Sequence, residues 1–335
     1  MTTLQDVLLS AIEIELQHQI SRLATPRLQP LHDMLTYHMG WTGDGSGRST
    51  QGKRIRPLLL LLICAACGGD WNAVLPAAAS VELVHNFSLI HDDIQDNSAK
   101  RRGRDTVWFK WGMPQGINAG DALFVIANSA LLDLVHSFDA ELIFSATTIL
   151  QAACLNLTEG QFLDISYEKR VDLTMEDYWT MATGKTAALL SACCAIGSLL
   201  GGGDETIRDA YRNYGHFLGL AFQVQDDYLG IWGDSALTGK SIASDLVTGK
   251  NSLPVLFGLE KKGAFAKRWL NGSISADEVR GLSDQLETEG ARLFTQNTAD
   301  QLTDMALQYL RSAEPVGDFG QELFELTNRL MGRQG

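Results

Sequence analysis

The sequence has no uninterrupted apolar run long enough to cross a bilayer. Its longest such run, residues 57–67, is shorter than the roughly 20 residues that a membrane-spanning helix requires. Residues 1–23 carry scattered charges and lack the layout of a signal peptide. We therefore expect a soluble, cytoplasmic protein without a transmembrane segment.

Positive charge and cysteine are also scarce. The formal net charge is −13, which argues against a nucleic-acid binder because such proteins need a basic face. A local basic pocket remains compatible with this balance, and divalent cations would then help to bind phosphates. The odd number of cysteines, without a secretion signal, indicates reduced thiols. Cys64 and Cys67 have the spacing of half a zinc site, but no second cysteine pair has suitable spacing, so we interpret them as core residues.

Sequence patterns typical of β-strands are scarce as well. Sustained period-two alternation and tight Asn-Gly or Asp-Gly turns between β-branched runs are missing. Side chains suited to a core recur instead at helical spacing, for example at positions 84, 87, 91 and 94. The fold class is therefore predicted to be all-α.

Helix starts and loops can be placed from local signals. The expected starts are marked by the capping boxes Thr174-x-x-Asp177 and Ser275-x-x-Glu278 and by Pro57, Pro114 and Pro254. The main irregular segment, residues 40–54, is rich in glycine and predicts a flexible loop near 40–52. No solenoid-length repeat or interdomain linker is evident. We expect a single helical domain over residues 1–335.

The stretch "IHDDIQDNSAKRRGR", residues 90–104, places an acidic cluster directly before a basic one. If residues 81–96 form a helix, Asp92 and Asp96 lie one turn apart on one face, with Asp93 beside them. Their apolar neighbours predict partial burial, which is costly for carboxylates unless a cation compensates it. The alternative is a solvated acidic helix end.

A second acidic cluster disfavours that alternative. The stretch "GLAFQVQDDYLG" puts Gln223, Asp226 and Asp227 on one face of another predicted helix. Two acidic faces on largely apolar helices suggest that both point toward one cavity. Ligand sets made only of oxygen favour Mg²⁺, which binds through carboxylates and substrate phosphates.

Basic residues are spread over several segments rather than gathered in a stripe. This distribution suits the lining of a phosphate pocket, in which arginine makes bidentate contacts and lysine supplies a point charge. Any one of them taken singly fits a solvated surface role better than a site role. The residues concerned are Lys53, Arg54, Arg56, Arg101, Arg102, Lys185, Lys240 and Lys250.

Two stretches come close to the phosphate-binding P-loop motif. The first, Gly47-x-x-x-x-Gly52-Lys53, continues with Arg54 where a Ser or Thr should hold the metal. The second, "GKT" at residues 184–186, has Trp179 in place of the leading glycine. Neither follows a predicted strand, which that motif requires, so we reject a P-loop.

Six motifs together identify a resemblance. The stretches "GKRIRP", "ELVHNFSLIHDDIQDNSAKRRGR", "AGDAL", "MATGKTAAL", "FQVQDDYLGIWGD" and "GKSIASDLVTGKNSLP" occur in the order typical of trans-isoprenyl diphosphate synthases, also called polyprenyl synthetases. The chain resembles that family from Lys53 to the end of the last motif. The resemblance implies an all-α isoprenoid-synthase bundle around an apolar cavity, usually a homodimer, most like short-chain geranylgeranyl or farnesyl diphosphate synthases.

The same resemblance implies a role for each matched residue. The aspartates of both motifs would hold several Mg²⁺ ions on the diphosphate of an allylic substrate: Asp92, Asp93, Asp96, Asp226 and Asp227. Isopentenyl diphosphate would be bound by Lys53, Arg56, His85 and Arg102. The allylic diphosphate would be held by Arg101, Lys185, Thr186, Gln223, Lys240 and Lys250, and we expect Lys185 and Arg101 to act in catalysis.

One departure from the family pattern concerns the second motif. Its last position, usually aspartate, is Gly230, so one metal or supporting contact is in question. Asp234 lies seven residues after Asp227, hence near the same face if the helix continues, although Gly233 argues against that. Because the two leading aspartates are present, we expect activity to survive.

Product length should depend on the depth of the cavity below Asp92. Phe87 lies five residues earlier, about 7.5 Å along a helix, and Ser88 follows it. In the family a bulky residue there acts as a floor, and the first motif lacks a two-residue insertion seen in many bacterial farnesyl diphosphate synthases. These features predict geranylgeranyl diphosphate (C20) before farnesyl diphosphate (C15). His91 adjoins the cluster, and we expect it to pack or to form a hydrogen bond.

Other functions remain to be distinguished. A terpene cyclase or head-to-head synthase would also use aspartate-held Mg²⁺, but it would not need the predicted isopentenyl diphosphate residues. A non-catalytic partner subunit would be expected to lose an aspartate cluster, and only Gly230 points that way. The sequence therefore favours a magnesium-dependent prenyltransferase.

Overall fold

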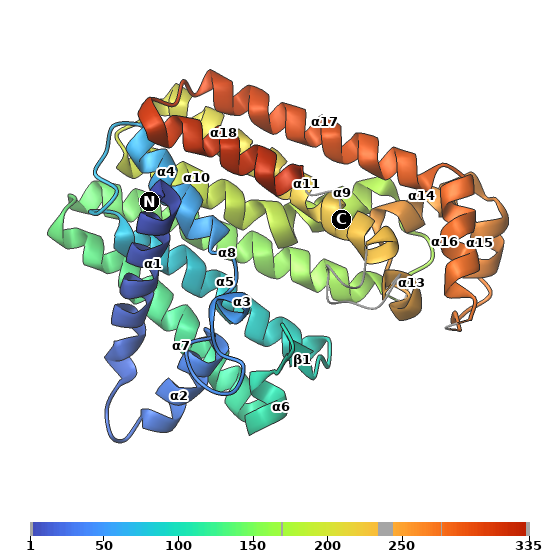
Figure 1. The fold of residues 1–335 in the computed structure, drawn as a ribbon, viewed down its shortest axis with the longest axis horizontal. Coiled ribbons are helices and arrows are strands. Elements are labelled where there is room, and N and C mark those ends of the chain that lie inside the picture. The colour runs from blue at the N-terminus through green and yellow to red at the C-terminus, as the bar shows by residue number, and fades with distance from the viewer. Residues whose placement is uncertain (1–2, 169, 234–243, 276, 333–335) are drawn as a thin grey trace. The chain divides into compact units, whose positions relative to one another are not determined.

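The structure, a computed structural model, describes residues 3–168, 170–233, 244–275 and 277–332. In these residues the chain is overwhelmingly helical (Figure 1), and its strands form one short antiparallel hairpin. The prediction of an all-α fold is confirmed.

The helices and strands follow in chain order. The first group comprises α1 (Leu4–Ile20), η1 (Ser21–Leu23), α2 (Gln29–His38), α3 (Arg48–Gln51), α4 (Ile55–Ala66), α5 (Leu75–Gln95), β1 (Lys100–Arg101), β2 (Arg104–Asp105), α6 (Val107–Trp111), α7 (Met113–Leu132) and η2 (Asp133–His136). The second comprises α8 (Ala140–Tyr167), α9 (Met175–Ala182), η3 (Thr183–Ala187), α10 (Ala188–Leu200), α11 (Glu205–Trp232), α13 (Ser244–Thr248), α14 (Leu253–Lys261), α15 (Ala264–Trp269), α16 (Val279–Thr288), α17 (Ala291–Ser312) and α18 (Gly317–Met331).

Most of the predicted helix starts are confirmed. Thr174 caps α9, and it and Asp177 form the reciprocal capping box. Pro114 lies in the first turn of α7 and Pro254 in the first turn of α14. The second box is misplaced: Ser275 and Glu278 do bond to each other, but α16 begins only at Val279.

The chain's internal contacts divide it into two compact units. Unit 1 comprises Met1–Gln151, Cys193–Arg208 and Pro315–Gln321, and unit 2 comprises Ala152–Ala192, Asp209–Glu314 and Glu322–Gly335. The interpretation of residues 1–335 as one domain stays a prediction.

Unit 1 is built around α5, which packs against α7, α4 and α1 (Figure 1). The apolar residues 58–64 of α4 are fully buried, and α5 is buried along most of its length. The helix α5 ends at Gln95, after which Asn97 adopts a left-handed φ of 51°. The first acidic cluster therefore lies at the carboxyl end of a core helix.

Unit 2 has its core around the amino-terminal part of α14. There Leu253 and Leu256 pack in one cluster with Tyr178, Leu220 and Val224. In addition, α14 packs against α17, α9, α15 and α16. This core surrounds the end of α11 that carries the second acidic cluster.

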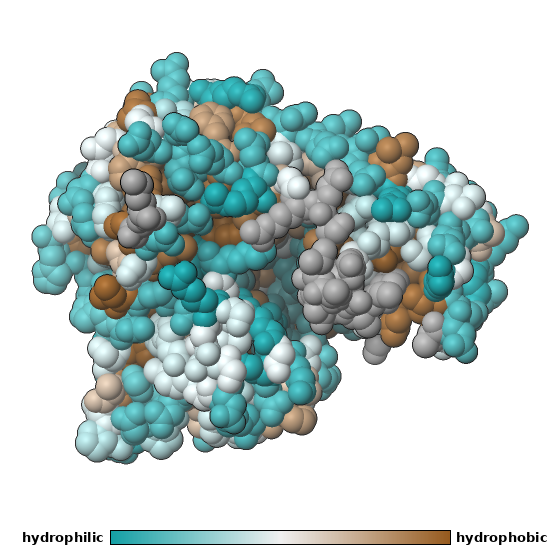
Figure 2. Space-filling view, in the orientation of Figure 1, coloured by the Kyte–Doolittle hydropathy of each residue, from teal (hydrophilic) through white to brown (hydrophobic). Residues whose placement is uncertain are grey.

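In the part of the chain that the structure describes, three helical segments are long and apolar enough, by length and composition alone, to cross a membrane: Met113–His136, Ala140–Tyr167 and Met175–Leu200. Polar residues such as Asn118 and Asp121 interrupt the first of them, which is why no long apolar run marks it in the sequence. On the face that Figure 2 shows, hydrophilic side chains predominate and apolar ones surface in separate patches. The absence of a transmembrane segment stays a prediction.

Candidate active site

The three aspartates of the first cluster differ in their surroundings. Asp93 is buried, and its carboxylate accepts hydrogen bonds from Arg101 Nε at 2.9 and 3.0 Å and pairs with Arg101 Nη2 at 2.9 Å. Burial raises the pKa of Asp93, against the lowering effect of the Arg101 guanidinium. Asp92 is half-buried and Asp96 is exposed. The two residues on the accessible side are therefore those one helical turn apart.

The basic residues that follow lie on the β1–β2 hairpin. Its turn contains Arg102 at a φ of +50°, and Arg102 Nη1 donates to the carbonyl of Thr50 at 2.9 Å. Burial lowers the pKa of Arg102, and the like charges of Arg101 and Arg54 lower it further. A bound anion would relieve this repulsion. Asp93, Arg101 and Arg102 line one small pocket of unit 1.

The residues expected to bind isopentenyl diphosphate also share an electrostatic environment. Burial lowers the pKa of His85 well below its usual value, and Arg56, Arg102 and Arg101 contribute in that order. His85 is thus neutral near pH 7. Arg56 has a buried Nε without a hydrogen-bond partner, and burial lowers its pKa. Lys53 has an exposed side chain just before the start of α4.

The second acidic cluster, like the first, combines a buried aspartate with a more accessible one. Asp227 is buried, and it accepts hydrogen bonds from Tyr178 Oη at 2.8 Å, the backbone N–H of Leu253 at 2.9 Å and Gln223 Nε2 at 2.9 Å. Burial raises its pKa to about 6, although the positive charge of Lys250 opposes that shift. Asp226, in contrast, is exposed on α11. In each pair of adjacent aspartates the second is fixed inside the fold and the first is more accessible.

Asp164 of α8 is a residue that the sequence analysis missed. It forms an ion pair with Lys185 of η3. Burial lowers the pKa of Lys250, but Asp227 and Asp164 raise it by more, so the net shift is upward. Two of the predicted allylic-diphosphate residues are therefore in electrostatic reach of the same carboxylate, which carries no local sequence signal besides its charge.

Thr186 and Gln223, also predicted to bind the allylic diphosphate, are connected by a short hydrogen bond. Thr186 Oγ1 donates to Gln223 Oε1 at 2.5 Å, and Gln223 in turn bonds Asp227. Lys240 and Asp234 lie outside the described residues.

The surroundings of Gly230 explain why no side chain fits there. A Cβ added at Gly230 would lie 2.4 and 2.7 Å from the two carboxylate oxygens of Asp245. Asp245 belongs to α13 and is buried. A carboxylate from another helix thus lies where the family pattern has its third aspartate.

Phe87 is a residue of α5, and its ring is directed toward α7. Its ring contacts Phe124 of α7, with centroids 4.9 Å apart, and His91, with centroids 5.6 Å apart. His91 Nε2 also lies 3.4 Å from the carbonyl oxygen of Ile117, as expected for a packing and hydrogen-bonding role. Ser88 is buried and donates to the carbonyl of His85 at 2.8 Å.

The site residues fall into both units. The first cluster, the hairpin arginines, Lys53, Arg56 and His85 belong to unit 1, and the second cluster, Lys185 and Lys250 belong to unit 2. Within the described residues, no group of three or more His, Cys, Asp or Glu side chains forms a ready metal cage. Convergence of both clusters on one cavity stays a prediction.

Comparison with known proteins gives a consistent result. The family described as "Polyprenyl synthetase" matches residues 47–282. A geranylgeranyl diphosphate synthase of Mycobacterium tuberculosis is 39% identical over 292 residues, covering 85% of this chain and 83% of the relative. A (2E,6E)-farnesyl diphosphate synthase of Mycobacterium bovis is 37% identical over 331 residues, covering 93% and 91%. The solved polyprenyl synthetase of Streptomyces coelicolor A3(2) superimposes with a TM-score of 0.85 at 36% identity, covering 96% of both chains.

Proposed function

Because the chain belongs to the polyprenyl synthetase family, we propose that it is a short-chain trans-prenyltransferase that condenses isopentenyl diphosphate head to tail with an allylic diphosphate. The observation that carries the proposal is that both pairs of adjacent aspartates have one buried and one more accessible member. Asp93 and Asp227 are fixed inside the fold, and their neighbours Asp92 and Asp226 are more accessible.

The donor set fits Mg²⁺. Asp92, Asp96 and Asp226 offer accessible carboxylate oxygens and no nitrogen or sulfur ligand, which suits a hard cation that also binds substrate phosphate. Asp93 and Asp227 would hold the ends of their helices in place through Arg101 and Tyr178. Mg²⁺ bound there supplies positive charge for a departing diphosphate.

Two sets of cationic and polar side chains would bind the two substrates. Isopentenyl diphosphate would be held by Lys53, Arg56, neutral His85 and Arg102. In this set the buried Nε of Arg56, which has no hydrogen-bond partner in the protein, gives the strongest support for an anion-binding role. The allylic diphosphate would be held by Arg101, Lys185, Thr186, Gln223, Lys250 and Lys240.

The chemistry then follows from these placements. The bond between the allylic carbon and its diphosphate oxygen breaks, and the bonding electrons leave with the diphosphate. Apolar helix walls exclude water from the resulting cation. The double bond of isopentenyl diphosphate attacks the cation, and a proton is lost to restore a double bond. The released pyrophosphate is the base that we propose.

Geranylgeranyl diphosphate is the product that we favour, with farnesyl diphosphate as the alternative. The ring of Phe87 on α5 contacts that of Phe124 on α7, and a bulky aromatic pair at this point supports a product of limited length. The relatives carry both names, so similarity alone does not choose between them.

We further propose that the protein is a cytoplasmic homodimer. Ile117, Val125 and Leu132 are exposed and recur at spacings of eight and seven along α7, hence on one helix face. Phe144, at the start of α8, is also exposed. Exposed apolar side chains that recur on one face of a helix are typical of interaction sites. Sedimentation analysis of the wild type and of Val125→Asp tests this assignment, and a monomeric wild type would contradict it.

Two alternatives are less well supported. A terpene cyclase would have no use for the cationic set around His85. A non-catalytic subunit is suggested only by Gly230, and in the structure the carboxylate of Asp245 lies where a side chain at position 230 would be.

Product analysis tests the function. The protein is incubated with isopentenyl diphosphate, Mg²⁺ and, separately, dimethylallyl, geranyl or farnesyl diphosphate, and the products are separated by chromatography. We expect elongated prenyl diphosphates that end at geranylgeranyl diphosphate. A released hydrocarbon would indicate a cyclase, and no turnover with any primer would indicate a partner subunit.

A further inference from the structure

Arg54 is a buried arginine inside the motif expected to bind isopentenyl diphosphate. It is 4% exposed and precedes the first residue of α4. Its backbone has φ 49° and ψ 38°, in the left-handed region that residues with a side chain seldom occupy. Such a conformation persists only where the surroundings enforce it.

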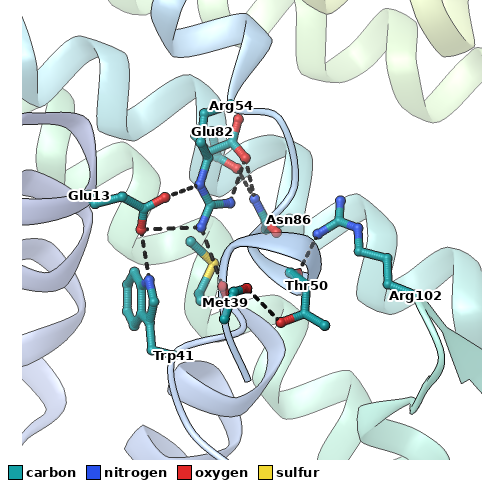
Figure 3. A network of polar contacts seen from close by, with 9 residues as sticks. Glu13, Met39, Trp41, Thr50, Arg54, Glu82, Asn86 and Arg102 are labelled. Atoms are coloured by element: carbon teal, nitrogen blue, oxygen red, sulfur yellow. Dashed lines mark hydrogen bonds and ion pairs between the residues drawn. The ribbon is translucent and has the colours of Figure 1, made fainter. Parts of the chain in front are cut away.

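Two glutamates from separate helices enforce it (Figure 3). Arg54 Nε donates to Glu13 of α1 at 2.6 Å, and Nη1 donates to Glu82 of α5 at 2.9 Å. Nη2 lies 3.4 Å from the carbonyl oxygen of Met39 and 3.5 Å from Glu13 Oε2. The guanidinium thus links α1, the end of α2 and α5 to the start of α4.

The glutamates are themselves held in place. Trp41 Nε1 donates to Glu13 Oε2 at 2.7 Å, and Asn86 Nδ2 donates to Glu82 Oε1 at 3.0 Å (Figure 3). Burial lowers the pKa of Arg54, but Glu82 and Glu13 raise it by more, so the guanidinium stays charged. Because all three of its nitrogens are engaged within the protein, Arg54 is poorly suited to bind substrate itself.

The network borders the predicted diphosphate ligands along the chain. Lys53 precedes Arg54, Arg56 follows it by two positions, and His85 precedes Asn86. Arg102 packs against the loop that leads into α4, because its Nη2 would be 2.7 Å from a Cβ added at Gly52. Fixing the backbone at Arg54 therefore fixes the directions in which its chain neighbours Lys53 and Arg56 point.

We infer that Arg54, clamped between Glu13 and Glu82, is a positioning residue that sets Lys53 and Arg56 in place for the diphosphate of isopentenyl diphosphate. This inference rests on the proposed function. It assigns to α1, far from the aspartate motifs in sequence, a specific part in binding one of the two substrates.

Steady-state kinetics of mild variants test the clamp. Glu13→Gln keeps the size of the side chain and removes its charge, and Arg54→Lys keeps the charge and removes the fork of donors. In both we expect the KM for isopentenyl diphosphate to rise by about tenfold or more, because small misplacements of binding groups are costly. The KM for the allylic diphosphate and kcat at saturation should change little.

Two controls separate this role from a merely structural one. Ser80 lies on the same helix as Glu82, and its hydroxyl donates a buried hydrogen bond to the carbonyl of Ala127 on α7. Ser80→Ala removes this bond and should lower the melting temperature without changing the KM for either substrate. Lys53→Met removes a proposed ligand and should raise the KM for isopentenyl diphosphate.

The outcomes discriminate between the claims. A selective rise in that KM for Glu13→Gln and Arg54→Lys supports the clamp. The clamp is overturned if Glu13→Gln and Arg54→Lys leave both KM values unchanged, or raise the KM for both substrates equally, while Lys53→Met still raises the KM for isopentenyl diphosphate alone. If Lys53→Met has no effect either, the assigned isopentenyl diphosphate site is wrong and the clamp fails with it.

Discussion

At the scale of single residues, adjacent aspartates of the same motif have different surroundings, since Asp93 and Asp227 are buried whereas Asp92 and Asp226 are more accessible. The residue spacing predicted that Asp92 and Asp96, and separately Asp226 and Asp227, share helix faces. It could not predict that Asp227 is buried, because its partners Tyr178 and Leu253 come from other elements. For the same reason Asp164 and Asp245 were missed, since each reaches its position only through the fold.

Gly230 offers a direct test of the role of Asp245. Gly230→Ala places a Cβ against the Asp245 carboxylate, so we expect that carboxylate to move and the rate of prenyl transfer to fall by at least about tenfold, the scale of losing one positioned polar group. Gly281→Ala is the matched control, because nothing lies within 4 Å of its added Cβ. Equal activity of both variants would remove Asp245 from the site.

Phe87 should limit product length. Phe87→Ala opens space next to Phe124, and we expect longer prenyl diphosphates in the product mixture. Because Phe87 is only half-buried, the loss of stability should be smaller than the roughly 3–5 kcal/mol of a fully buried phenylalanine. Phe87→Leu should give a smaller shift with less destabilisation. Phe109→Ala, at an exposed ring on α6, should leave the products unchanged. An unaltered product distribution in both Phe87 variants would refute the floor role.

At the scale of elements, helix periodicity and capping chemistry predicted an all-helical chain and several helix starts. The body of α5 and the start of α9 follow from apolar spacing and from the Thr174 box, which are local in sequence. The start of α16 was misplaced because Glu278 is also bound by Arg268 at 2.7 and 2.8 Å, a contact from another helix. The π-helical turn η3 likewise has no local signal.

That turn is packed closely against α8. A Cβ at Gly160 would lie 2.0 Å from the backbone nitrogen of Lys185, which backbone atoms cannot accommodate without a shift. Gly160→Ala should therefore cost about 1–3 kcal/mol in stability and raise the KM for the allylic diphosphate by displacing Lys185. Thermal unfolding and kinetics measure the two effects. Ser166→Ala, on the exposed side of the same helix, should change neither, and a fully active, stable Gly160→Ala would contradict the close packing.

At the scale of the whole molecule, acid should destabilise the protein through buried neutral histidines. Burial, with Arg101 and Arg102 nearby, lowers the pKa of His38 from 6.5 to about 3. The unfolded state therefore binds more protons below pH 6.5, so the stability contributed by neutral His38 is complete above that pH and is lost as the pH falls toward 3.

Denaturant unfolding at pH 7 and pH 5 tests this dependence. Between these values His38→Gln should lose about 2 kcal/mol less stability than the wild type. His18→Gln, at an exposed position on α1, should lose as much as the wild type. Identical losses in all three proteins would show that His38 is not a buried neutral group.

The most direct measurement is a double-mutant cycle on prenyl transfer. Asp92→Asn and Asp226→Asn, separately and together, are assayed with isopentenyl and farnesyl diphosphates over a range of Mg²⁺ concentrations. If both clusters act on the same diphosphate, each single variant should lose about 10²–10³ in kcat, and the double variant should lose much less than the product of the two. Losses that multiply, or a single variant with wild-type activity, would contradict a shared metal-bound diphosphate.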